Sequence, residues 1–483
     1  MHFTRTKIIF LFFTLSFCSA LLGQAPISRL YGTYGTETGT SGLILDDSTI
    51  FALGTSSAFP SMSSQIYLVK IDKNGDIMWS KFYGGTGVDD AVDMFVDLAN
   101  DTSIYILSNS FINFSKGYDV KLTKVDKNGN FIWEKNYGTT DWDIPSKMIK
   151  TSTDMFAICG KTYGNTNGMI DGMFLLLDNN GDSIVFNNYG GVNDDSFNDL
   201  IERSADSIVV VGETFTSTGM QRAWMVEMNI ETGTSTNSYF GSVYNRTFNS
   251  IEKYKKGNYL IGLTTDSTGI TQTDMFIEVM DKNTHNINLV VPVIEANDEI
   301  CVEAKFFNNE FYFLGLTKTY GLGGWEPVVY RYDTLGGYQY SKTFGTVEDD
   351  YATTIIPNKN NSFAFIGTSG FVFGVTDLWV LNLDSAFTNI PTLDSQLDIN
   401  AIHENEESMP NFSIFPNPFN DFISIKSDEM PFQLILLNEI GEVIFKDFNT
   451  RNISLSVIQP GIYFLNLNFK SGSSSTQCVV KIK

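Results

Sequence analysis

The stretch Tyr83-Gly-Gly-Thr-Gly-Val-Asp-Asp90 opens a unit that recurs along this chain at a nearly constant spacing. An aromatic residue followed by glycine and then by Gly, Thr or Ser recurs at Tyr34, Tyr83, Tyr137, Tyr189, Phe240 and Phe344. The steps between these positions are 49, 54, 52, 51 and 104 residues. The last step is twice 52, which predicts a degenerate copy near Val291-Pro292-Val293. Seven repeats of about 50 residues predict an array of similar supersecondary units, each unable to bury its apolar faces alone.

The unit that begins at Tyr83 has the pattern of four strands. Apolar and polar residues interleave over 91–97, and a nearly continuous apolar run follows at 103–108. Residues 119–125 alternate with a period of two, and the turn at 126–130 contains Asn-Gly before the last strand at 131–137. Four antiparallel strands in about 50 residues, repeated radially, are typical of a β-propeller blade.

The two ends of the array indicate how a ring would close. The last repeat runs through 378–383 and stops without a fourth strand, while an additional strand at 27–34 precedes the first glycine motif. We therefore expect an all-β, seven-bladed β-propeller over 24–386, in which the N-terminal strand completes the last blade and removes both exposed edges. Six or eight blades would follow if the weak copy near Val291 is miscounted. A solenoid is the structural alternative, but it would need capping units that the sequence does not show.

The charge balance restricts the class of partner. The 483 residues include 32 basic and 55 acidic side chains, for a net charge of -23. Such a surface repels phosphate backbones and anionic lipids, so we expect neither nucleic acid nor a membrane surface as a partner.

The N-terminus has the pattern of a secretory signal peptide, which we assign to residues 1–23. A basic start is followed by an apolar stretch at 8–17 that is too short to span a bilayer. Phe17 precedes Cys18 where a lipoprotein signal needs a small residue, so ordinary export is favoured over lipidation. No other apolar run approaches membrane-spanning length, so we expect no membrane span after signal removal.

The pattern changes beyond the repeats. Residues 387–410 are polar and acidic, which predicts a linker. From 411 to 483 about seven short strands, separated by Asn-Pro, Ile-Gly-Glu and Pro-Gly turns, predict a small Ig-like β-sandwich.

Four landmarks in this last segment resemble the type A sorting domain of the Bacteroidota type IX secretion system. They are Phe415-Pro-Asn-Pro-Phe-Asn-Asp421, Leu437-Asn-Glu-Ile-Gly-Glu-Val443, Gln459-Pro-Gly-Ile-Tyr463 and the basic tail Val480-Lys-Ile-Lys483. The motif positions are Pro416, Asn417, Pro418, Gly441, Gly461, Tyr463 and Lys481. The resemblance implies transit through the periplasm, export across the outer membrane by the type IX machinery, and removal of the domain by a cell-surface sortase. The repeats likewise resemble propeller repeats of such exported proteins, through residues 72–76 and 79–85.

Residue types that carry common chemistry are scarce. After signal removal only His285 and His403 remain, which weighs against histidine-dependent hydrolysis and zinc sites. Neither a nucleophile elbow nor a phosphate-binding glycine loop is present. The segments 72–76 and 178–182 resemble calcium loops, but their glycine falls at position four and no glutamate follows at position twelve, so we interpret them as hairpin turns. The cysteines of the mature chain are expected to be small buried hydrophobes rather than disulfide partners, and they are Cys159, Cys301 and Cys478.

An acidic residue recurs just before the innermost strand of five repeats. These residues are Asp90, Asp143, Asp195, Glu299 and Asp350. On a propeller they would lie near one mouth of the central channel, where converging carboxylates could bind calcium or a polyol. The alternative, which we favour, is that they cap turns and keep loops hydrated. No other cofactor is expected.

Three functions fit these observations. The first is a secreted or cell-surface propeller that binds a glycan or a protein. The second is a carbohydrate-active enzyme that uses two carboxylates as acid and base. The third is a structural component of the surface or matrix. Propellers support all three, and the scarcity of catalytic motifs favours the non-enzymatic ones. Two carboxylates at glycosidase distance in an aromatic-walled cleft would indicate the enzyme.

Overall fold

The computed structural model describes residues 26–482 with gaps. The residues outside the description are 34, 46, 58–62, 86, 99–101, 114, 165–166, 242, 267–271, 321–323, 360, 373–374, 385–386, 388–390, 392, 398–411, 428–430, 439–442, 449 and 470–473. The signal peptide expected at 1–23 therefore lies outside the described residues. The chain divides into two compact units, Met1–Ala401 and Ile402–Lys483. Strands dominate the described residues of both units, with one short 3-10 helix at Lys255–Gly257.

The described part of the first unit contains six four-stranded antiparallel sheets and one five-stranded sheet, numbered here in chain order. Sheet 1 is β2 (Glu37–Ile44), β3 (Ile50–Ser56), β4 (Gln65–Ile71) and β5 (Ile77–Tyr83). Sheet 2 is β6 (Asp89–Asp97), β7 (Ser103–Asn113), β8 (Gly117–Val125) and β9 (Phe131–Tyr137). Sheet 3 is β10 (Asp143–Lys150), β11 (Phe156–Thr162), β12 (Asp171–Leu177) and β13 (Ser183–Tyr189). Sheet 4 is β14 (Asp195–Ser204), β15 (Ser207–Phe215), β16 (Gln221–Asn229) and β17 (Ser235–Phe240).

The remaining sheets of this unit follow the same order. Sheet 5 is β18 (Arg246–Tyr254), β19 (Asn258–Asp266), β20 (Thr273–Asp281) and β21 (Ile287–Val293). Sheet 6 is β22 (Glu299–Phe307), β23 (Glu310–Thr317), β24 (Glu326–Asp333) and β25 (Tyr338–Thr343). Sheet 7 is β26 (Asp350–Pro357), β27 (Ser362–Val372), β28 (Val375–Asp384), β1 (Ile27–Gly32) and β29 (Asp394–Leu397). Four antiparallel strands over 89–137 confirm the prediction made for the Tyr83 repeat. β21 occupies the place predicted for the degenerate copy near Val291.

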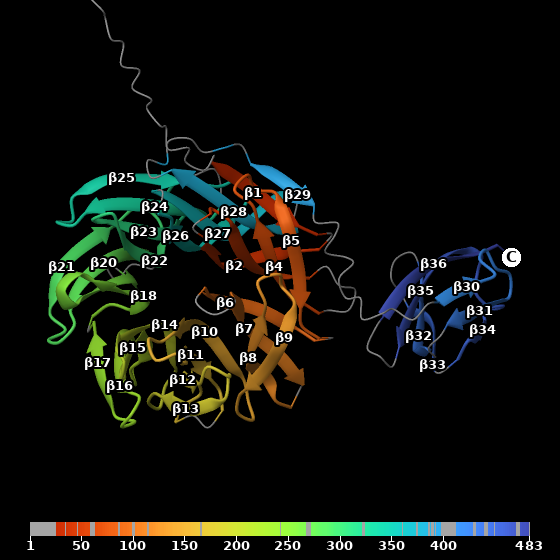
Figure 1. The fold of residues 1–483 in the computed structure, drawn as a ribbon, viewed down its shortest axis with the longest axis horizontal. Helices are drawn as coiled ribbons and strands as arrows, with labels where there is room; N and C mark the ends of the chain where they lie inside the picture. The colour runs from red at the N-terminus through yellow and green to blue at the C-terminus, as the bar shows by residue number, and fades with distance from the viewer. Residues whose placement is uncertain are drawn as a thin grey trace, which may run out of the picture. The chain divides into compact units, whose positions relative to one another are not determined.

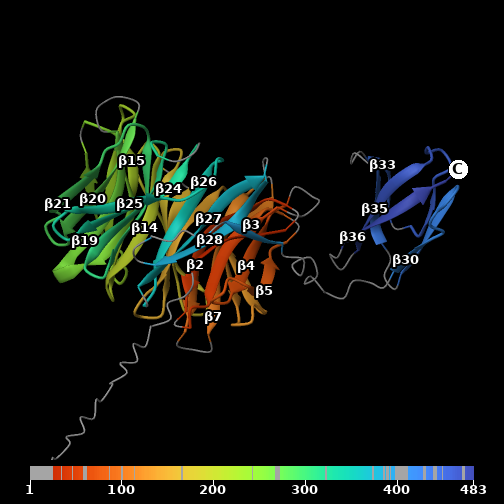
Figure 2. The same ribbon diagram turned by 90° about the horizontal axis from the view of Figure 1, so that it is seen from above.

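The sheets of the first unit stand around a common centre, with first strands inside and fourth strands outside (Figure 1). Neighbouring first strands contact each other in chain order from β2 to β26, and β26 contacts β2 in turn. In the view turned by 90°, the strands run across the thickness of this ring (Figure 2). Apolar cores lie between successive sheets, and one of them joins Tyr67 and Val69 of sheet 1 to Ala364 and Ile366 of sheet 7. The second strands are buried on both faces, as their apolar runs predicted.

The N-terminal strand pairs with the last repeat, as the sequence predicted. β1 runs antiparallel to β28, with Leu30 opposite Trp379. The expected linker at 387–410, however, begins too early. Phe387 is buried in the core between sheets 6 and 7, and β29 runs parallel to β1 as a fifth strand. The carboxylate of Asp394 in this strand lies 3.2 Å from the guanidinium of Arg29. Asp394 is one of the acidic residues that predicted a linker, but it forms an ion pair with a residue of β1.

The first copy of the glycine motif is also shifted from its predicted place. Tyr31 donates a hydrogen bond to the carbonyl of Gly75 at 2.7 Å, just as Tyr83 donates to Gly129 at 2.8 Å. The copy is therefore Tyr31-Gly32-Thr33 rather than the one at Tyr34, which lies outside the described residues. The sequence Leu-Tyr-Gly-Thr-Tyr-Gly-Thr offers both frames, and only the hydrogen bond to the next sheet distinguishes them.

The second unit contains two small sheets in its described part. One is β30 (Phe412–Phe415), β31 (Phe422–Ser427) and β34 (Asn452–Ser454). The other is β33 (Val443–Phe448), β32 (Pro431–Leu437), β35 (Gly461–Phe469) and β36 (Ser474–Lys481). A single apolar cluster draws on both sheets, with Ile423 from the first and Leu434 and Leu465 from the second.

Candidate functional site

One face of the ring, called here the loop face, collects two kinds of connection. The segments between successive sheets lie beside the loops that join second to third strands. Backbone hydrogen bonds link them, from Phe111 to Val88 at 2.8 Å, from Tyr163 to Trp142 at 2.8 Å, and from Lys318 to Asp298 at 3.0 Å. The hairpins between first and second strands and between third and fourth strands form the opposite face, called here the turn face.

The two faces differ in polarity. Large apolar side chains are exposed along much of the loop face, and they are Trp142, Met169, Val192, Val243, Tyr244, Ile294, Tyr320 and Val347. The described turns of the turn face are mostly polar, with Leu98 and Leu335 exposed within them. Phe131, Ile287 and Tyr338, which begin fourth strands beside these turns, are exposed as well. Its Asp72 accepts backbone N–H bonds from Asn74 at 2.8 Å and Asp76 at 2.9 Å, and Asp178 does the same in its turn. These bonds support the hairpin interpretation of both segments. The connections of the loop face thus expose apolar side chains to a potential partner.

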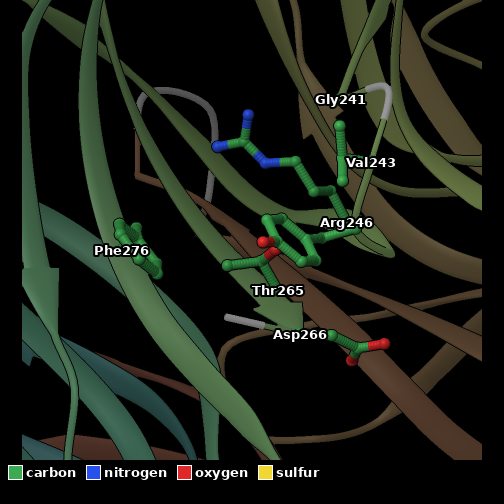
Figure 3. Close-up of a pocket in the computed structure, with 7 residues that line it drawn as sticks. Gly241, Val243, Arg246, Thr265, Asp266 and Phe276 are labelled. Carbon is green, nitrogen blue, oxygen red and sulfur yellow. The ribbon is translucent and has the colours of Figure 1, made fainter. Parts of the chain in front are cut away.

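A pocket of about 360 Å3 opens on the loop face at the junction of sheets 4 and 5. It is lined by Gly241, Val243, Tyr244, Arg246, Thr265, Asp266 and Phe276. Figure 3 shows the Arg246 side chain extending between Val243 and Phe276, while the Asp266 carboxylate points away from it. Pockets of this size, with a few polar groups among apolar walls, are typical of small-ligand sites.

Arg246 gives this junction its distinct chemistry. Six residues after the motif aromatic, the other described repeats carry Asp or Glu, whereas Phe240 is followed by Arg246. The Arg246 guanidinium bonds Glu278 of β20 at 2.6 Å, and Arg222 donates to the carbonyl of Gly241 at 2.8 Å. Asn245 fixes Asp266 with a 2.7 Å hydrogen bond. The pocket thus combines a positioned cation, a carboxylate, a hydroxyl and two aromatic rings.

The five predicted acidic residues lie in five different sheets. Asp143, Asp195, Glu299 and Asp350 each begin the first strand of a sheet and are buried. Asp90 is the second residue of β6, whereas Asp89 is the first. The prediction of Asp90 is therefore wrong by one residue, and Asp89 occupies the equivalent position. The same position holds Glu37 in sheet 1, which sequence reasoning missed because the first motif was placed at Tyr34. The described residues hold no group of three or more His, Cys, Asp or Glu side chains that could bind a metal.

Hydrogen bonds explain why these acids recur. Asp143, Asp195 and Asp350 each accept the backbone N–H of the residue four positions earlier, at 2.5, 2.7 and 2.5 Å. Each carboxylate therefore closes the connection that enters its sheet, which supports the turn-capping interpretation. The preceding motif glycine leaves room for it, because a Cβ at Gly84 would lie 2.6 Å from the equivalent oxygen of Asp89.

A second charged group lines the inner strands. Every first strand contains a β-bulge at the same level. The side chain of the residue after the bulge contacts the first strand of a neighbouring sheet. Asp93 accepts the N–H of Met148 at 3.1 Å, Asp199 that of Ile251 at 2.8 Å, and Glu303 that of Ile355 at 3.0 Å. Burial raises the pKa of Asp199 to about 6 and that of nearby Glu252 to about 7, although Lys147 and Lys305 respectively oppose these shifts. These carboxylates join the first strands to one another.

The motif residues of the C-terminal unit meet in three dimensions. Asn417 accepts the N–H of Val480 at 2.9 Å, and Lys481 donates to the carbonyls of Asn420 at 2.6 Å and Leu455 at 2.7 Å. Tyr463 of β35 donates to the carbonyl of Gln459 at 2.7 Å and so closes the turn that contains Gly461. Pro416 and Pro418 flank Asn417 between β30 and β31, while Gly441 lies outside the described residues. The first and last landmarks are therefore parts of one local structure.

Comparison with known proteins identifies the C-terminal unit. Residues 413–481 match the model of the secretion system C-terminal sorting domain. The chain therefore consists of an all-β, propeller-like repeat region followed by a sorting domain. That domain is the address of the type IX secretion system, which confirms the resemblance carried by its four landmarks and supports export to the cell surface or medium.

Solved structures show only a distant likeness. The extracellular domain of a hybrid two-component system from B. thetaiotaomicron is 10% identical, with a TM-score of 0.43 over 92% of this chain, and the chain spans 56% of that domain. The β-propeller domain of the Trilobed protease from Pyrococcus furiosus is 10% identical, with a TM-score of 0.44 over 72% of this chain and 95% of that one. The Dos1 propeller is 13% identical, with a TM-score of 0.41 over 76% of this chain and 97% of that one. A search of curated proteins found no match. Across the described residues, no helix has the length and apolar character that crossing a membrane requires.

Proposed function

We propose that this chain is a secreted or cell-surface, seven-bladed β-propeller that binds a glycan through its loop face. In this proposal a signal peptide at 1–23 delivers the chain to the periplasm. The Ig-like C-terminal sandwich then addresses it to the type IX machinery and is removed by the sortase. The count of seven sheets, the contact of β26 with β2 and the pairing of β1 with β28 support the closed ring.

We choose a glycan as the ligand because of the side chains that line the pocket between sheets 4 and 5. Sugar rings present an apolar face and a rim of hydroxyl groups. Tyr244, 41% exposed, and Phe276 supply aromatic surface for the apolar face. Arg246, Asp266 and Thr265 supply donors and acceptors for the hydroxyls. An acidic sugar would gain most, because Arg246 is the cation that lines the pocket.

A protein ligand is the second candidate. It is favoured by the exposed apolar side chains that extend beyond the pocket, from Trp142 through Val192 to Val347. Such a surface fits a partner that covers several loops at once, whereas a sugar would occupy one pocket.

The enzymatic alternative finds no support in the close carboxylate pair Asp171–Asp195. Asp171 and Asp195 approach each other at the junction of sheets 3 and 4, but their exposed fractions are 0% and 2%. A glycosidase pair has to flank the scissile bond in an open cleft, which these side chains cannot do.

A glycan array probed with the mature full-length protein tests the proposal. We expect binding to a restricted set of glycans, and Tyr244→Ala should weaken it at least about tenfold because the stacking surface is lost. Leu335→Ala, on the turn face, should bind like the unmodified protein. Binding that Tyr244→Ala leaves unchanged, or no glycan binding at all, would contradict the assignment and leave the protein-ligand and structural alternatives.

A further inference from the structure

Three residues form a row next to the loop face in each sheet of the first unit. The first-strand residue lies opposite a Ser or Thr of the second strand, and this lies opposite a third-strand residue. In chain order the rows are Glu37–Ser56–Gln65, Asp89–Ser110–Asp119, Asp143–Thr162–Asp171, Asp195–Thr214–Arg222, Arg246–Thr265–Asp274, Glu299–Thr317–Glu326 and Asp350–Ser369–Asp377.

These rows bring carboxylates together across the junctions between sheets. A Cβ placed on Gly190 would lie 2.4 Å from Oδ2 of Asp195 in sheet 4 and 2.6 Å from Oδ1 of Asp171 in sheet 3. The two oxygens are therefore at most about 5 Å apart. Gly138 stands in the same way between Asp119 at 2.4 Å and Asp143 at 2.9 Å. The junctions thus contain paired carboxylates from different sheets.

The pair at the junction of sheets 3 and 4 is buried and incompletely bonded. Asp171 accepts hydrogen bonds from Asn167 and Asn188 on Oδ2, both at 2.9 Å, while its Oδ1 has no hydrogen-bond partner. Burial raises the pKa of Asp195, and the neighbouring Asp171 raises it further. Between sheets 5 and 6, Asp274 is 0% exposed and neither of its oxygens has a partner, while Oε2 of the adjacent Glu299 also has none. A buried carboxylate oxygen without a hydrogen bond is unfavourable. These oxygens therefore indicate a bound group that the protein's own side chains do not supply.

Two other junctions contain their own cation. Asp89 occupies the position of Asp195, and its Oδ1 lies 2.6 Å from the ammonium of Lys121. The opposing residue there is Gln65, so a single carboxylate is matched by a single positive charge. Arg246 places a guanidinium at the same position between sheets 4 and 5. In the described part of the chain, no Lys or Arg forms an ion pair with Asp171, Asp195, Asp274 or Glu299.

We propose that a divalent cation bridges Asp171 and Asp195 at the junction of sheets 3 and 4, and that Asp274 and Glu299 hold a second one between sheets 5 and 6. Calcium fits best, because it binds carboxylate oxygens of separate side chains at Ca–O distances of about 2.3–2.6 Å and accepts an irregular oxygen shell. Two carboxylates neutralise its charge, and backbone carbonyls or water would complete its oxygen shell. The ion would link neighbouring sheets, whereas Lys121 neutralises Asp89 within sheet 2. This inference is independent of the glycan proposal.

Equilibrium dialysis of the chelator-treated mature protein against calcium chloride counts the ions directly. We expect about two bound calcium ions per chain, with affinity in the range of extracellular modules, about 0.1–1 mM. Asp171→Asn and Asp274→Asn should each remove about one. Asp178→Asn, in an exposed turn, should remove none and serves as the matched control.

Thermal unfolding separates ion binding from a purely structural role. Calcium should raise the melting temperature of the unmodified protein, and Asp171→Asn should reduce this rise. In the presence of chelator, the melting temperature of Asp171→Asn should equal or exceed that of the unmodified protein. The substitution removes one of the two negative charges that Asp171 and Asp195 bring together. Three results would overturn the proposal. The first is a melting temperature of Asp171→Asn below that of the unmodified protein both with and without calcium. The second is an equal rise of the melting temperatures of Asp171→Asn and Asp178→Asn on adding calcium, and the third is stabilisation of the protein by acid but not by calcium. An equal effect of sodium chloride at matched ionic strength would also overturn it, because simple screening would then suffice.

Discussion

At the scale of single residues, each member of the repeated motif has its own physical role. Tyr83 donates to the carbonyl of Gly129 in the next sheet, and Gly85 donates its N–H to Asp89 at 2.8 Å. Gly84 lies between them at φ 138°, where a side chain would meet the Asp89 carboxylate. The motif was visible from its spacing alone. Its partners were not, because one is six residues away and the other lies in the following repeat.

The missed copy at Tyr31 has the same origin. Spacing could not choose between two overlapping Tyr-Gly-Thr frames, whereas the acidic residue six positions after the aromatic would have selected Tyr31, through Glu37. The same rule would have moved Asp90 to Asp89 and singled out Arg246 as the exception. The signal for the pocket was therefore present in the sequence, as the one repeat whose acid is replaced by a base.

A pH effect follows from the carboxylate between sheets 7 and 1. Burial raises the pKa of Asp377 to about 6, and the neighbouring Glu37 adds to the shift. The folded state then binds the proton more tightly than the unfolded state does, so stability is highest below about pH 4 for this group and is lost as pH rises through 6. The melting temperature of the chelator-treated protein should therefore fall between about pH 4 and 6, and Asp377 should add no further slope above about pH 7.

Asp377→Asn isolates this contribution in the same calorimetric series. It should flatten part of the pH dependence and stabilise the protein by about 1–3 kcal/mol at pH 8, where the carboxylate is charged. Asp178→Asn should leave the pH dependence of the melting temperature unchanged. Hydrogen bonds to its carboxylate lower the pKa of Asp178, so this group titrates below the pH range in which Asp377 does. A destabilised Asp377→Asn with an unaltered slope would show that this carboxylate carries no such repulsion.

At the scale of strands, local pattern predicted most elements and contacts between distant segments decided the rest. The second strands follow from apolar runs such as 156–159 and 208–211, which are buried on both faces. β29 could not be predicted in this way, because it is a short polar strand stabilised by parallel pairing with β1 and by Arg29. The seven aligned bulges were equally hidden, since they depend on the spacing between neighbouring first strands rather than on one strand's sequence.

The closing strand gives a direct prediction at this scale. Leu30 and Tyr31 of β1 are buried, and β1 pairs on one side with β28 and on the other with β29. A mature protein that begins at Thr36 should lose much of its thermal stability or aggregate, because the edge of β28 is uncovered and β29 loses its partner. Tyr31→Phe removes only the hydrogen bond to Gly75 and should cost about 1 kcal/mol. An unchanged melting temperature of the shortened protein would exclude a closing role for β1.

At the scale of the whole molecule, the chain divides its tasks between two units with separate cores. The first unit has cores shared between successive sheets, and the second has a core of its own around Leu434 and Leu465. The sorting function was predictable because its landmarks are contiguous motifs. The sequence does not specify a ligand, because a binding surface on repeated loops depends on which side chains meet in space. The linker expected at 387–410 must also be shortened at its start, since β29 reaches Leu397 and belongs to the first unit.

The central claim is that the C-terminal unit is an export address that the repeat region does not need for folding. The direct measurement is quantitative fractionation of cells with a type IX system, comparing the full chain with one that ends at Ala401. The account predicts that the full chain reaches the surface or medium without its sorting domain, while the shortened chain accumulates in the periplasm as a folded, protease-resistant protein. Arrival of the shortened chain at the surface or medium at the normal level would contradict it.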